Sequence, residues 1–300
     1  MSDRPQPRVR IVGGGPGGMA AGIWCHRLGL DARIYEGRGE LGGQLCRVFS
    51  PVPDYPGIPG TDGPDLARRI ADHVSGLGVP VELGCSVERL EVDPLRLRLD
   101  DGREVEADAV ILAGGVARRR LEVPGEEIHR GLGLSYSVSK ELGSVSAREV
   151  AVIGGGDAAF EGALLLTHEC ERIHLIHRDS TRARPDFRAA VAAEPRIVVH
   201  AGERVVGLEG EASLTGVRLA GGGRIPAERV FVRIGVEPRI VDASFPLARD
   251  ERGYLRVDRF NRCAPGVYAV GDVCSPDAMS VSVAVGHAMI ACKHVQSGWL

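Results

Sequence analysis

Two glycine-rich turns are the residues of this 300-residue chain whose types and spacing most directly suggest chemistry. The first, Gly-x-Gly-x-x-Gly at 13–18, follows an apolar strand at 9–12 and precedes a small-residue helix expected from Met19 to about Leu28. Glycine lets the backbone approach a pyrophosphate, and the helix N-terminus supplies N–H groups and a positive dipole. A second strand ends at Glu36, whose carboxylate can accept hydrogen bonds from ribose hydroxyls. This order predicts a dinucleotide-binding βαβ unit.

The same plan occurs a second time. A strand at 149–153 leads to a Gly-x-Gly-x-x-Ala turn at 154–159, a helix expected to about Thr167 and a strand at 172–176. A glycine hairpin and a closing apolar strand follow in each half, with hairpin glycines at 102 and 221–223 and closing strands at 107–114 and 227–235. The repeat predicts an α/β fold with two Rossmann-like, three-layer dinucleotide-binding domains. Two nucleotide sites indicate an electron-transfer enzyme that uses a flavin and a nicotinamide.

The residue that follows each turn at the same spacing differs in charge. Glu36 lies 23 residues after Gly13, whereas His177 lies 23 residues after Gly154 and is followed by Arg178. An acid favours the free ribose of FAD, and a basic cluster favours the 2′-phosphate of NADPH over NADH. Two alternatives stay open: Asp179 could bind a ribose instead, and the cluster could be a solvated basic turn.

Composition excludes several other classes of protein. The net charge of −3 argues against a polyanion-binding surface, so no nucleic-acid partner is expected. There is no apolar run of about 18 residues and no secretory signal, so neither a membrane span nor secretion is expected. The seven cysteines include no Cys-x-x-Cys pair, which indicates a reducing, cytoplasmic compartment, and no metal site is expected.

Further motifs resemble the low-molecular-weight thioredoxin reductase family over nearly the whole chain. They are Leu-Gly-Gly-Gln-Leu at 41–45, Asp-Tyr-Pro-Gly at 54–57, the segments 121–126 and 131–136, and Gly-Asp-Val at 271–273. The resemblance implies an FAD domain formed by residues 1–116 and 241–300, with an NAD(P)H domain at 117–240 inserted into it. It also implies a homodimer.

The turns and the resemblance together give two sets of expected cofactor ligands. Those for FAD are Gly13, Gly15, Pro16, Gly17, Gly18, Glu36, Gly43, Gln44, Leu45, Gly271 and Asp272. Those for NADPH are Gly154, Gly156, Asp157, Ala158, His177, Arg178 and Arg182. The resemblance further implies that a C-terminal helix, expected to begin near Ala284, directs its N-terminus at the flavin.

The chain departs from this family at its redox centre. The thioredoxin reductases carry Cys-x-x-Cys after a Ser-Tyr pair, whereas this chain has Ser137 and Lys140 at the two cysteine positions. Serine cannot take part in thiol–disulfide exchange, so the usual relay to a protein disulfide is excluded. The segment 279–281 also lacks the family's Arg-Gln pair.

The sequence identifies no catalytic residue and offers three candidates. Cys46 follows the Gly-Gly-Gln loop, but an isolated cysteine is more often a packed thiol. His287 is expected in the first turn of the last helix. It could transfer a proton to or from the flavin, or it could be an ordinary histidine at a helix end without a catalytic role. Lys140 could face the flavin or lie in solvent at a helix start.

The leading hypothesis is an FAD-dependent oxidoreductase in which NADPH reduces FAD, and FAD passes electrons directly to a small molecule or a redox carrier. A ferredoxin/flavodoxin–NADP reductase, which the same resemblance suggests, is one alternative. A substrate-fed flavin oxidase with a vestigial NADPH site is another. The alternative that is not an enzyme is a flavin-binding sensor without turnover.

Overall fold

The strand–turn–helix–strand plan is present twice in the computed structural model, which describes residues 6–49, 51–145, 147–178 and 180–299. The chain splits into two compact units, Met1–Ala117 with Glu237–Leu300, and Arg118–Val236. The inserted unit ends at Val236, four residues before the end expected at residue 240. Ile240 packs against a core of the first unit, as Val241 does, so this stretch belongs to the first unit.

The first unit is built on a six-stranded sheet of order β19-β20-β7-β1-β2-β3, in which β19 alone is antiparallel to its neighbour. Its strands are β1 (Arg8–Val12), β2 (Asp31–Glu36), β3 (Val81–Leu83), β7 (Ala109–Leu112), β19 (Arg262–Ala264) and β20 (Val267–Ala269). Strand β20 follows the second unit in the chain and pairs parallel with β7, so both ends of the chain form one sheet.

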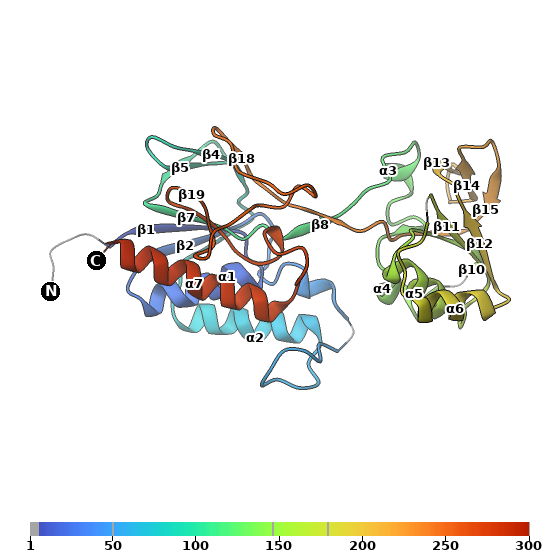
Figure 1. The fold of residues 1–300 in the computed structure, drawn as a ribbon, viewed down its shortest axis with the longest axis horizontal. Coiled ribbons are helices and arrows are strands. Elements are labelled where there is room, and N and C mark those ends of the chain that lie inside the picture. The colour runs from blue at the N-terminus through green and yellow to red at the C-terminus, as the bar shows by residue number, and fades with distance from the viewer. Residues whose placement is uncertain (1–5, 50, 146, 179, 300) are drawn as a thin grey trace. The chain divides into compact units, whose positions relative to one another are not determined.

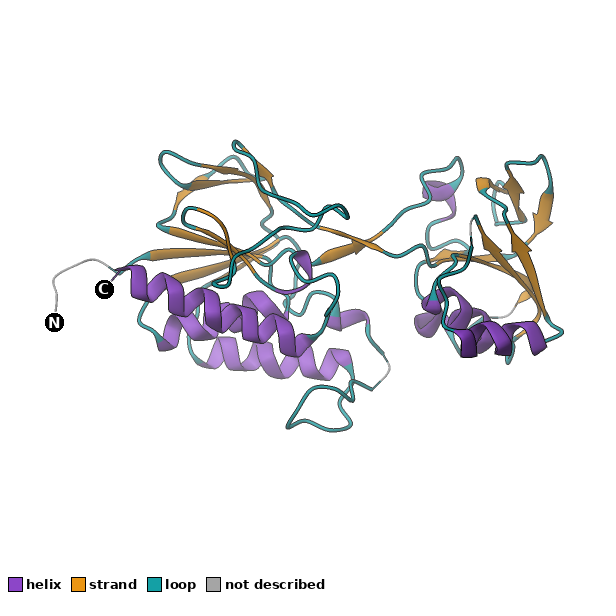
Figure 2. Cartoon of the chain, viewed as in Figure 1, coloured by secondary structure: helices purple, strands orange, loops and turns teal. Residues whose placement is uncertain are grey.

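Three helices cover one face of this sheet, and a small second sheet covers the other (Figures 1 and 2). The helices are α1 (Pro16–Arg27), α2 (Gly63–Gly76) and α7 (Val281–Trp299). The second sheet, of order β18-β4-β5-β6, contains β4 (Val87–Glu91), β5 (Arg96–Leu99), β6 (Glu104–Glu106) and β18 (Asp242–Ala243). Side chains of β7 alternate between the two cores: Ile111 packs toward the helices, and Val110 and Leu112 pack toward the small sheet.

The second unit repeats this layered arrangement. Its five-stranded parallel sheet has the order β12-β11-β10-β16-β9. The strands are β9 (Leu134–Ser135), β10 (Ala147–Ile153), β11 (Cys170–His177), β12 (Ile197–Ala201) and β16 (Arg229–Val232). The helices are α3 (Glu126–His129), α4 (Val138–Glu141), α5 (Asp157–Leu166) and α6 (Pro185–Ala193). An antiparallel sheet comprises β13 (Val205–Glu209), β14 (Gly216–Leu219) and β15 (Arg224–Pro226). The prediction of two Rossmann-like α/β domains is confirmed.

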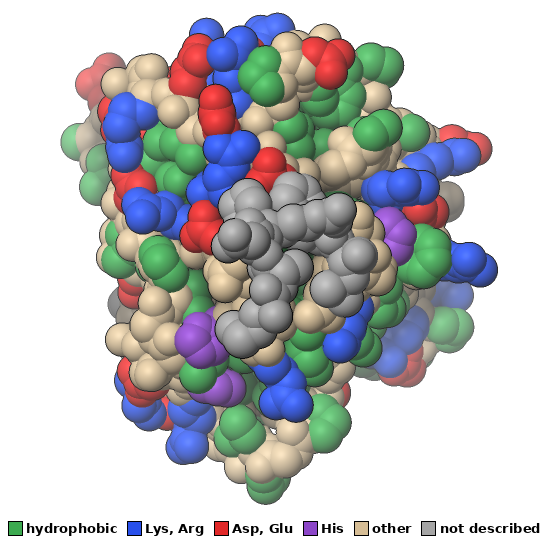
Figure 3. Space-filling model, turned by 90° about the vertical axis from the view of Figure 1, so that its left-hand side faces the viewer, with side chains coloured by type: hydrophobic (Ala, Val, Ile, Leu, Met, Phe, Trp, Pro, Cys, Tyr) green, Lys and Arg blue, Asp and Glu red, His purple; other side chains and the backbone are tan. Residues whose placement is uncertain are grey.

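The remaining elements are short. The segments that connect the units, β8 (Val116–Arg118) and β17 (Val236–Pro238), pair as a two-stranded ribbon. Two 3-10 helices, η1 (Leu45–Arg47) and η2 (Gly271–Val273), lie in the first unit. On the face drawn in Figure 3, acidic and basic side chains are intermixed. Within the described ranges, no helix is long and apolar enough to cross a membrane.

Candidate functional sites at the two glycine turns

The first glycine turn is packed so closely at its first and last glycines that a side chain does not fit at either position. Strand β1 ends at Val12, and Gly13 takes a φ of +107°. A Cβ at Gly13 would lie 2.5 Å from the carbonyl oxygen of Ala113, and one at Gly18 would lie 1.9 Å from that of Gly13. Helix α1 then begins at Pro16, where proline is favoured because its missing N–H has no partner in the first turn. The spacing of the glycines therefore fixes the entry of β1 into α1.

Glu36 occupies the end of β2, beside this turn. One carboxylate oxygen accepts the backbone N–H of Gly14 at 2.6 Å, and the other accepts that of Arg38 at 2.9 Å. The parallel pairing of β1 with β2 places Val12 opposite Tyr35, so the acid follows directly beside the turn. The expected acid is thus held by backbone donors at the mouth of the glycine turn.

The Gly-Gly-Gln loop packs on the same turn. The backbone N–H of Gly42 donates to the carbonyl of Gly14 at 2.8 Å, and Arg38 donates to the carbonyl of Gly43 at 2.9 Å. A Cβ at Gly43, whose φ is +59°, would lie 2.9 Å from the Cα of Gly15. The loop residues Gly43, Gln44 and Leu45 are therefore brought to the expected FAD ligands of the turn.

Asp272 reaches this group from the other end of the chain. The Gln44 side chain donates to the Asp272 carboxylate at 2.9 Å, across 228 positions of sequence. Burial raises the pKa of Asp272 above its usual value, and the Gln44 hydrogen bond partly opposes that shift. Gly271, with a φ of +74°, packs its turn against Ala284 of α7.

The last helix begins earlier than the sequence indicated. Helix α7 starts at Val281, and the Ser280 hydroxyl accepts the backbone N–H of Val283 at 3.2 Å as an N-cap. His287 is consequently in the second turn of the helix and not in the first. Its Nδ1 lies 3.7 Å from the thiol of Cys274. The expectation for His287 missed the cap because Ser280 lies among residues without apolar periodicity.

The second glycine turn is as closely packed at its first glycine, where a Cβ at Gly154 would lie 2.3 Å from the carbonyl oxygen of Arg233. Gly154, with a φ of +149°, donates its N–H to the carbonyl of Ile176 at 2.9 Å. A Cβ at Gly156 would meet nothing within 4 Å, so the turn is open on that side. Asp157 begins α5, and its carboxylate accepts the Arg184 backbone N–H at 2.7 Å and pairs with the guanidinium at 3.0 Å.

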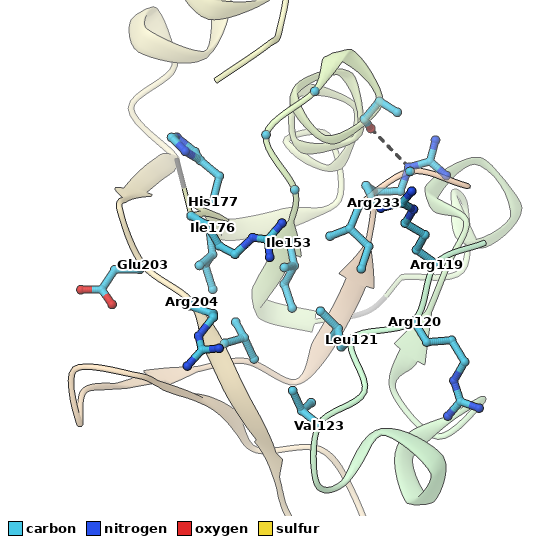
Figure 4. A pocket seen from close by; sticks show the side chains of 18 of the residues that line it. Arg119, Arg120, Leu121, Val123, Ile153, Ile176, His177, Glu203, Arg204 and Arg233 are labelled. Atoms are coloured by element: carbon cyan, nitrogen blue, oxygen red, sulfur yellow. Dashed lines mark hydrogen bonds between the residues drawn. The ribbon is translucent and has the colours of Figure 1, made fainter. Parts of the chain in front are cut away.

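A cavity of about 1030 Å³ opens over this second turn (Figure 4). His177, at the end of β11, is buried in its wall, whereas Arg178 and Arg182 are exposed at its rim. The backbone N–H of Arg182 donates to the carbonyl of Gly155 at 2.8 Å, which holds the basic loop against the turn. All seven expected NADPH ligands line this cavity. Asp179, the alternative ribose ligand, lies outside the described residues.

Four further basic residues line the cavity, and the glycine motifs did not predict them. Arg119 and Arg120 follow β8, Arg204 precedes β13 and Arg233 directly follows β16. For Arg233 a sequence signal existed, because it interrupts the apolar run from Val230 to Ile234. The other three come from segments distant from the glycine turn, and nothing in its motif points to them.

The segments 121–126 and 131–136 have a structural role in the second unit. The buried carboxylate of Glu126 accepts the backbone N–H groups of Leu121 and Glu122, each at 2.8 Å. It also accepts the Tyr136 hydroxyl. Burial and the carboxylate raise the pKa of Tyr136 to about 12. These hydrogen bonds connect the segment that follows β8 to the residue that follows β9.

The surroundings of the two remaining catalytic candidates, Cys46 and Lys140, do not activate their side chains. The Cys46 thiol donates weakly to the carbonyl of Leu41 at 3.4 Å, and burial raises its pKa. Lys140 is exposed in the short helix α4. A thiol with a raised pKa is a poor nucleophile, since the thiolate is the reactive form.

Known proteins resemble this chain in sequence and in fold. Residues 7–288 match the family described as pyridine nucleotide-disulphide oxidoreductases. The chain belongs to this family. Among its relatives, a thioredoxin reductase of Bacillus subtilis is 28% identical over 304 residues, covering 99% of this chain and 96% of that protein. A thioredoxin reductase of Mycolicibacterium smegmatis is 31% identical over 275 residues, 88% of each chain.

A solved structure of another thioredoxin reductase has a similar fold. The thioredoxin reductase of Lactococcus lactis superimposes with a TM-score of 0.82 at 28% identity, covering 98% of this chain and 100% of that one. The resemblance to thioredoxin reductases is confirmed, and so is the prediction of an oxidoreductase. This pyridine nucleotide-disulphide oxidoreductase therefore shares its relatives' fold.

Proposed function

We propose that this protein is an FAD-dependent oxidoreductase in which NADPH is the electron donor and the acceptor reaches the flavin directly, without a dithiol. The observation that carries the proposal is the pair of complete glycine turns, one with a carboxylate at its mouth and the other with a basic cavity. Residues 1–117 and 237–300 would form the FAD domain, and residues 118–236 the NADPH domain.

The residues of the first unit suit FAD. A Cβ at Gly15 would meet only the Cα of Gly43, at 3.9 Å, so its backbone is open to a phosphate. Glu36 would bind the ribose of the adenosine, because both its oxygens retain acceptor capacity beyond their single backbone bonds. Gln44 and Asp272 would bind the chain that links the pyrophosphate to the flavin ring.

The residues of the second unit suit NADPH. The cavity combines an open glycine turn, the positive end of α5 and several guanidinium groups. Arg178 and Arg182 would bind the 2′-phosphate, since guanidinium groups form charge-assisted, bidentate hydrogen bonds with phosphate. Buried His177 would form the wall beside the adenosine ribose.

The missing dithiol determines the class of acceptor. Residues 137 and 140 are serine and lysine, and no two cysteines of the chain have Cys-x-x-Cys spacing. When bound, FAD supplies the hydride-accepting and electron-donating chemistry, and the protein supplies position and electrostatics. A small molecule or a redox carrier protein is therefore the proposed acceptor. The homodimer and the cytoplasmic location stay predictions.

The test is an anaerobic titration of the FAD-loaded protein with NADPH, followed by the visible flavin absorbance. We expect stoichiometric bleaching, with NADH requiring a higher concentration. Flavin that stays oxidised with both nucleotides would contradict the proposal and favour the substrate-fed oxidase or the sensor.

A second measurement separates the acceptor classes. With NADPH as donor, we expect steady turnover with ferricyanide, a small electron acceptor, and none with the disulfide of a thioredoxin. A thioredoxin reductase carrying a dithiol serves as the positive control for the disulfide assay. Turnover of the thioredoxin disulfide at a comparable rate would contradict direct transfer.

A further inference from the structure

The guanidinium group of Arg233 is held at the second glycine turn by hydrogen bonds to backbone carbonyl groups. Its Nε donates to the carbonyl of Ala158 at 3.3 Å, and its Nη1 donates to that of Tyr136 at 3.0 Å. Its own backbone N–H donates to the carbonyl of Ile153 at 2.7 Å. Ala158 belongs to the first turn of α5, so the guanidinium lies at the N-terminal end of that helix.

The charge of Arg233 is not neutralised within its surroundings. Among residues that the structure describes, its hydrogen-bond acceptors are carbonyl oxygens, and no carboxylate forms an ion pair with it. Burial and, to a smaller extent, nearby Arg118 lower its pKa to about 10, and Glu161 opposes the shift. A partly desolvated cation without a counter-ion, lining a cavity, favours an anionic ligand.

Basic side chains lie on two sides of the glycine turn. In the sheet order β11-β10-β16, the turn follows the middle strand, with His177 at the end of β11 and Arg233 after β16. Figure 4 shows His177 and Arg204 on one side of the cavity, and Arg119 and Arg233 on the other. Neighbouring strands are about 4.8 Å apart, so the two sides are separated by roughly 10 Å.

This separation matches the two halves of a dinucleotide. When the pyrophosphate lies over the turn of β10, an adenosine directed at β11 leaves the second phosphate and the nicotinamide half toward β16. The β11 side then meets the 2′-phosphate, which only NADPH carries. The β16 side meets a phosphate that NADPH and NADH share.

We propose that Arg233 binds the phosphate on the nicotinamide side of the dinucleotide's pyrophosphate, an inference that rests on the proposed nicotinamide site. The described contacts engage Nε and Nη1 and leave Nη2 for the ligand. The two carbonyls orient the guanidinium before the ligand arrives, which reduces the ordering cost of binding. Arg233 therefore sets affinity for both nucleotides and does not discriminate between them.

The test compares three ligands by isothermal titration calorimetry, all of them unable to reduce the flavin. NADP⁺ and NAD⁺ carry both phosphates of the pyrophosphate, whereas 2′,5′-ADP lacks the one on the nicotinamide side. For Arg233→Gln we expect Kd for NADP⁺ and NAD⁺ to rise by about tenfold to a hundredfold, the range of a charge-assisted hydrogen bond. Kd for 2′,5′-ADP should stay unchanged.

Two matched variants calibrate this pattern. Arg178→Gln should show the opposite pattern, with weaker NADP⁺ and 2′,5′-ADP binding and unchanged NAD⁺ binding. Arg224→Gln removes an exposed arginine that pairs with Glu209 at 2.9 Å in the same unit, and should leave all three ligands unaffected. If Arg233→Gln does not fold, Arg233→Lys carries the test, with a smaller loss in the same pattern.

Several outcomes would overturn the inference. Equal weakening of all three ligands would mean that Arg233 only maintains the shape of the turn. Unchanged Kd values for every ligand would mean that it does not touch the phosphate. A wild-type protein that binds neither NADP⁺ nor 2′,5′-ADP would instead refute the nicotinamide site itself, which separates failure of the proposed function from failure of this inference.

Discussion

Five parallel strands have the same order in the two units, β20-β7-β1-β2-β3 in the first and β9-β16-β10-β11-β12 in the second, and the first unit adds the antiparallel β19. In both units the central strand enters the glycine turn and has two strands on each side. The units differ in which part of the chain supplies the outer strand next to β7 or β16. That strand is β20 in the first unit, which comes after the insertion, and β9 in the second, which comes before the turn. Strand order is thus preserved while chain order changes, because a parallel sheet requires neighbours in space and not in sequence.

The units also differ at the residue beside the turn. Glu36 ends β2 as a carboxylate held by two backbone N–H groups, whereas His177 ends β11 as a buried imidazole. The same backbone position thus presents negative charge to one ligand, and the arginines around the other turn present positive charge. Under the proposed function, one scaffold would thus bind two nucleotides that differ at the ribose.

The largest expected effect tests the close packing of the two turns. Gly18→Ala would place its Cβ 1.9 Å from the Gly13 carbonyl oxygen, whereas the matching residue in the second turn is already Ala159. We expect Gly18→Ala to lower the free energy of unfolding by about 3 kcal/mol through overpacking, and to lose FAD. Urea denaturation and flavin content measure both effects.

The matched control for this prediction is Ala159→Gly, which should cost only about 1 kcal/mol because it changes helix propensity without a clash. Equal stability of Gly18→Ala and wild type would show that the first turn is no tighter than the second.

A second prediction concerns the pH response of a buried histidine in the second unit. Burial, with smaller effects of His200 and Arg172, lowers the pKa of His174 to about 4, and its Nδ1 lies 3.0 Å from the His200 ring nitrogen. Between pH 6.5 and 4 the unfolded chain binds a proton that the folded chain does not, so stability falls as pH falls. We expect a loss on the order of 2 kcal/mol across this window.

Urea denaturation at a series of pH values measures this loss. His174→Gln should reduce the loss of stability in this window, and the lowered pKa values of His200 and His287 account for part of what is left. His73→Gln, at an exposed position of the first unit, should leave the profile unchanged. A wild-type profile that is already flat between pH 6.5 and 4 would contradict the assignment to His174.

A third prediction addresses the acid of the first turn. Glu36→Gln keeps the shape of the side chain but replaces one acceptor oxygen with a donor, which weakens a backbone hydrogen bond and the proposed ribose contact. We expect the Kd for FAD to rise by about tenfold. Calorimetry on apoprotein reloaded with FAD measures the change. His177→Gln, at the matching position, should leave FAD affinity at the wild-type value, and a loss of FAD affinity there would contradict separate sites.

The smallest effect is expected at two of the catalytic candidates, Cys46 and Lys140. Cys46→Ala and Lys140→Ala should each leave NADPH-dependent ferricyanide turnover within about twofold, because a protonated thiol and an exposed amine do not carry the electrons. Steady-state kinetics give this result directly. A hundredfold loss in Cys46→Ala would place a thiol in the electron path and remove the contrast with dithiol enzymes.

Much of the fold could be predicted because its signals are local. The strands at 9–12 and 149–153, both glycine turns and the residues Glu36 and His177 follow from short apolar runs and fixed spacings. The start of α7 could not, since its cap at Ser280 lies among residues without a periodic pattern.

The sequence by itself determined the repeated βαβ plan, the opposite charges beside the two turns and the lack of a Cys-x-x-Cys pair. Only the tertiary structure decided that Gln44 meets Asp272, and that Arg233 enters the cavity of the second turn. The physical reason is the sequence distance over which the residues interact. Turn geometry depends on neighbouring residues, whereas these side chains are brought together by the parallel pairing of strands that are distant in the chain.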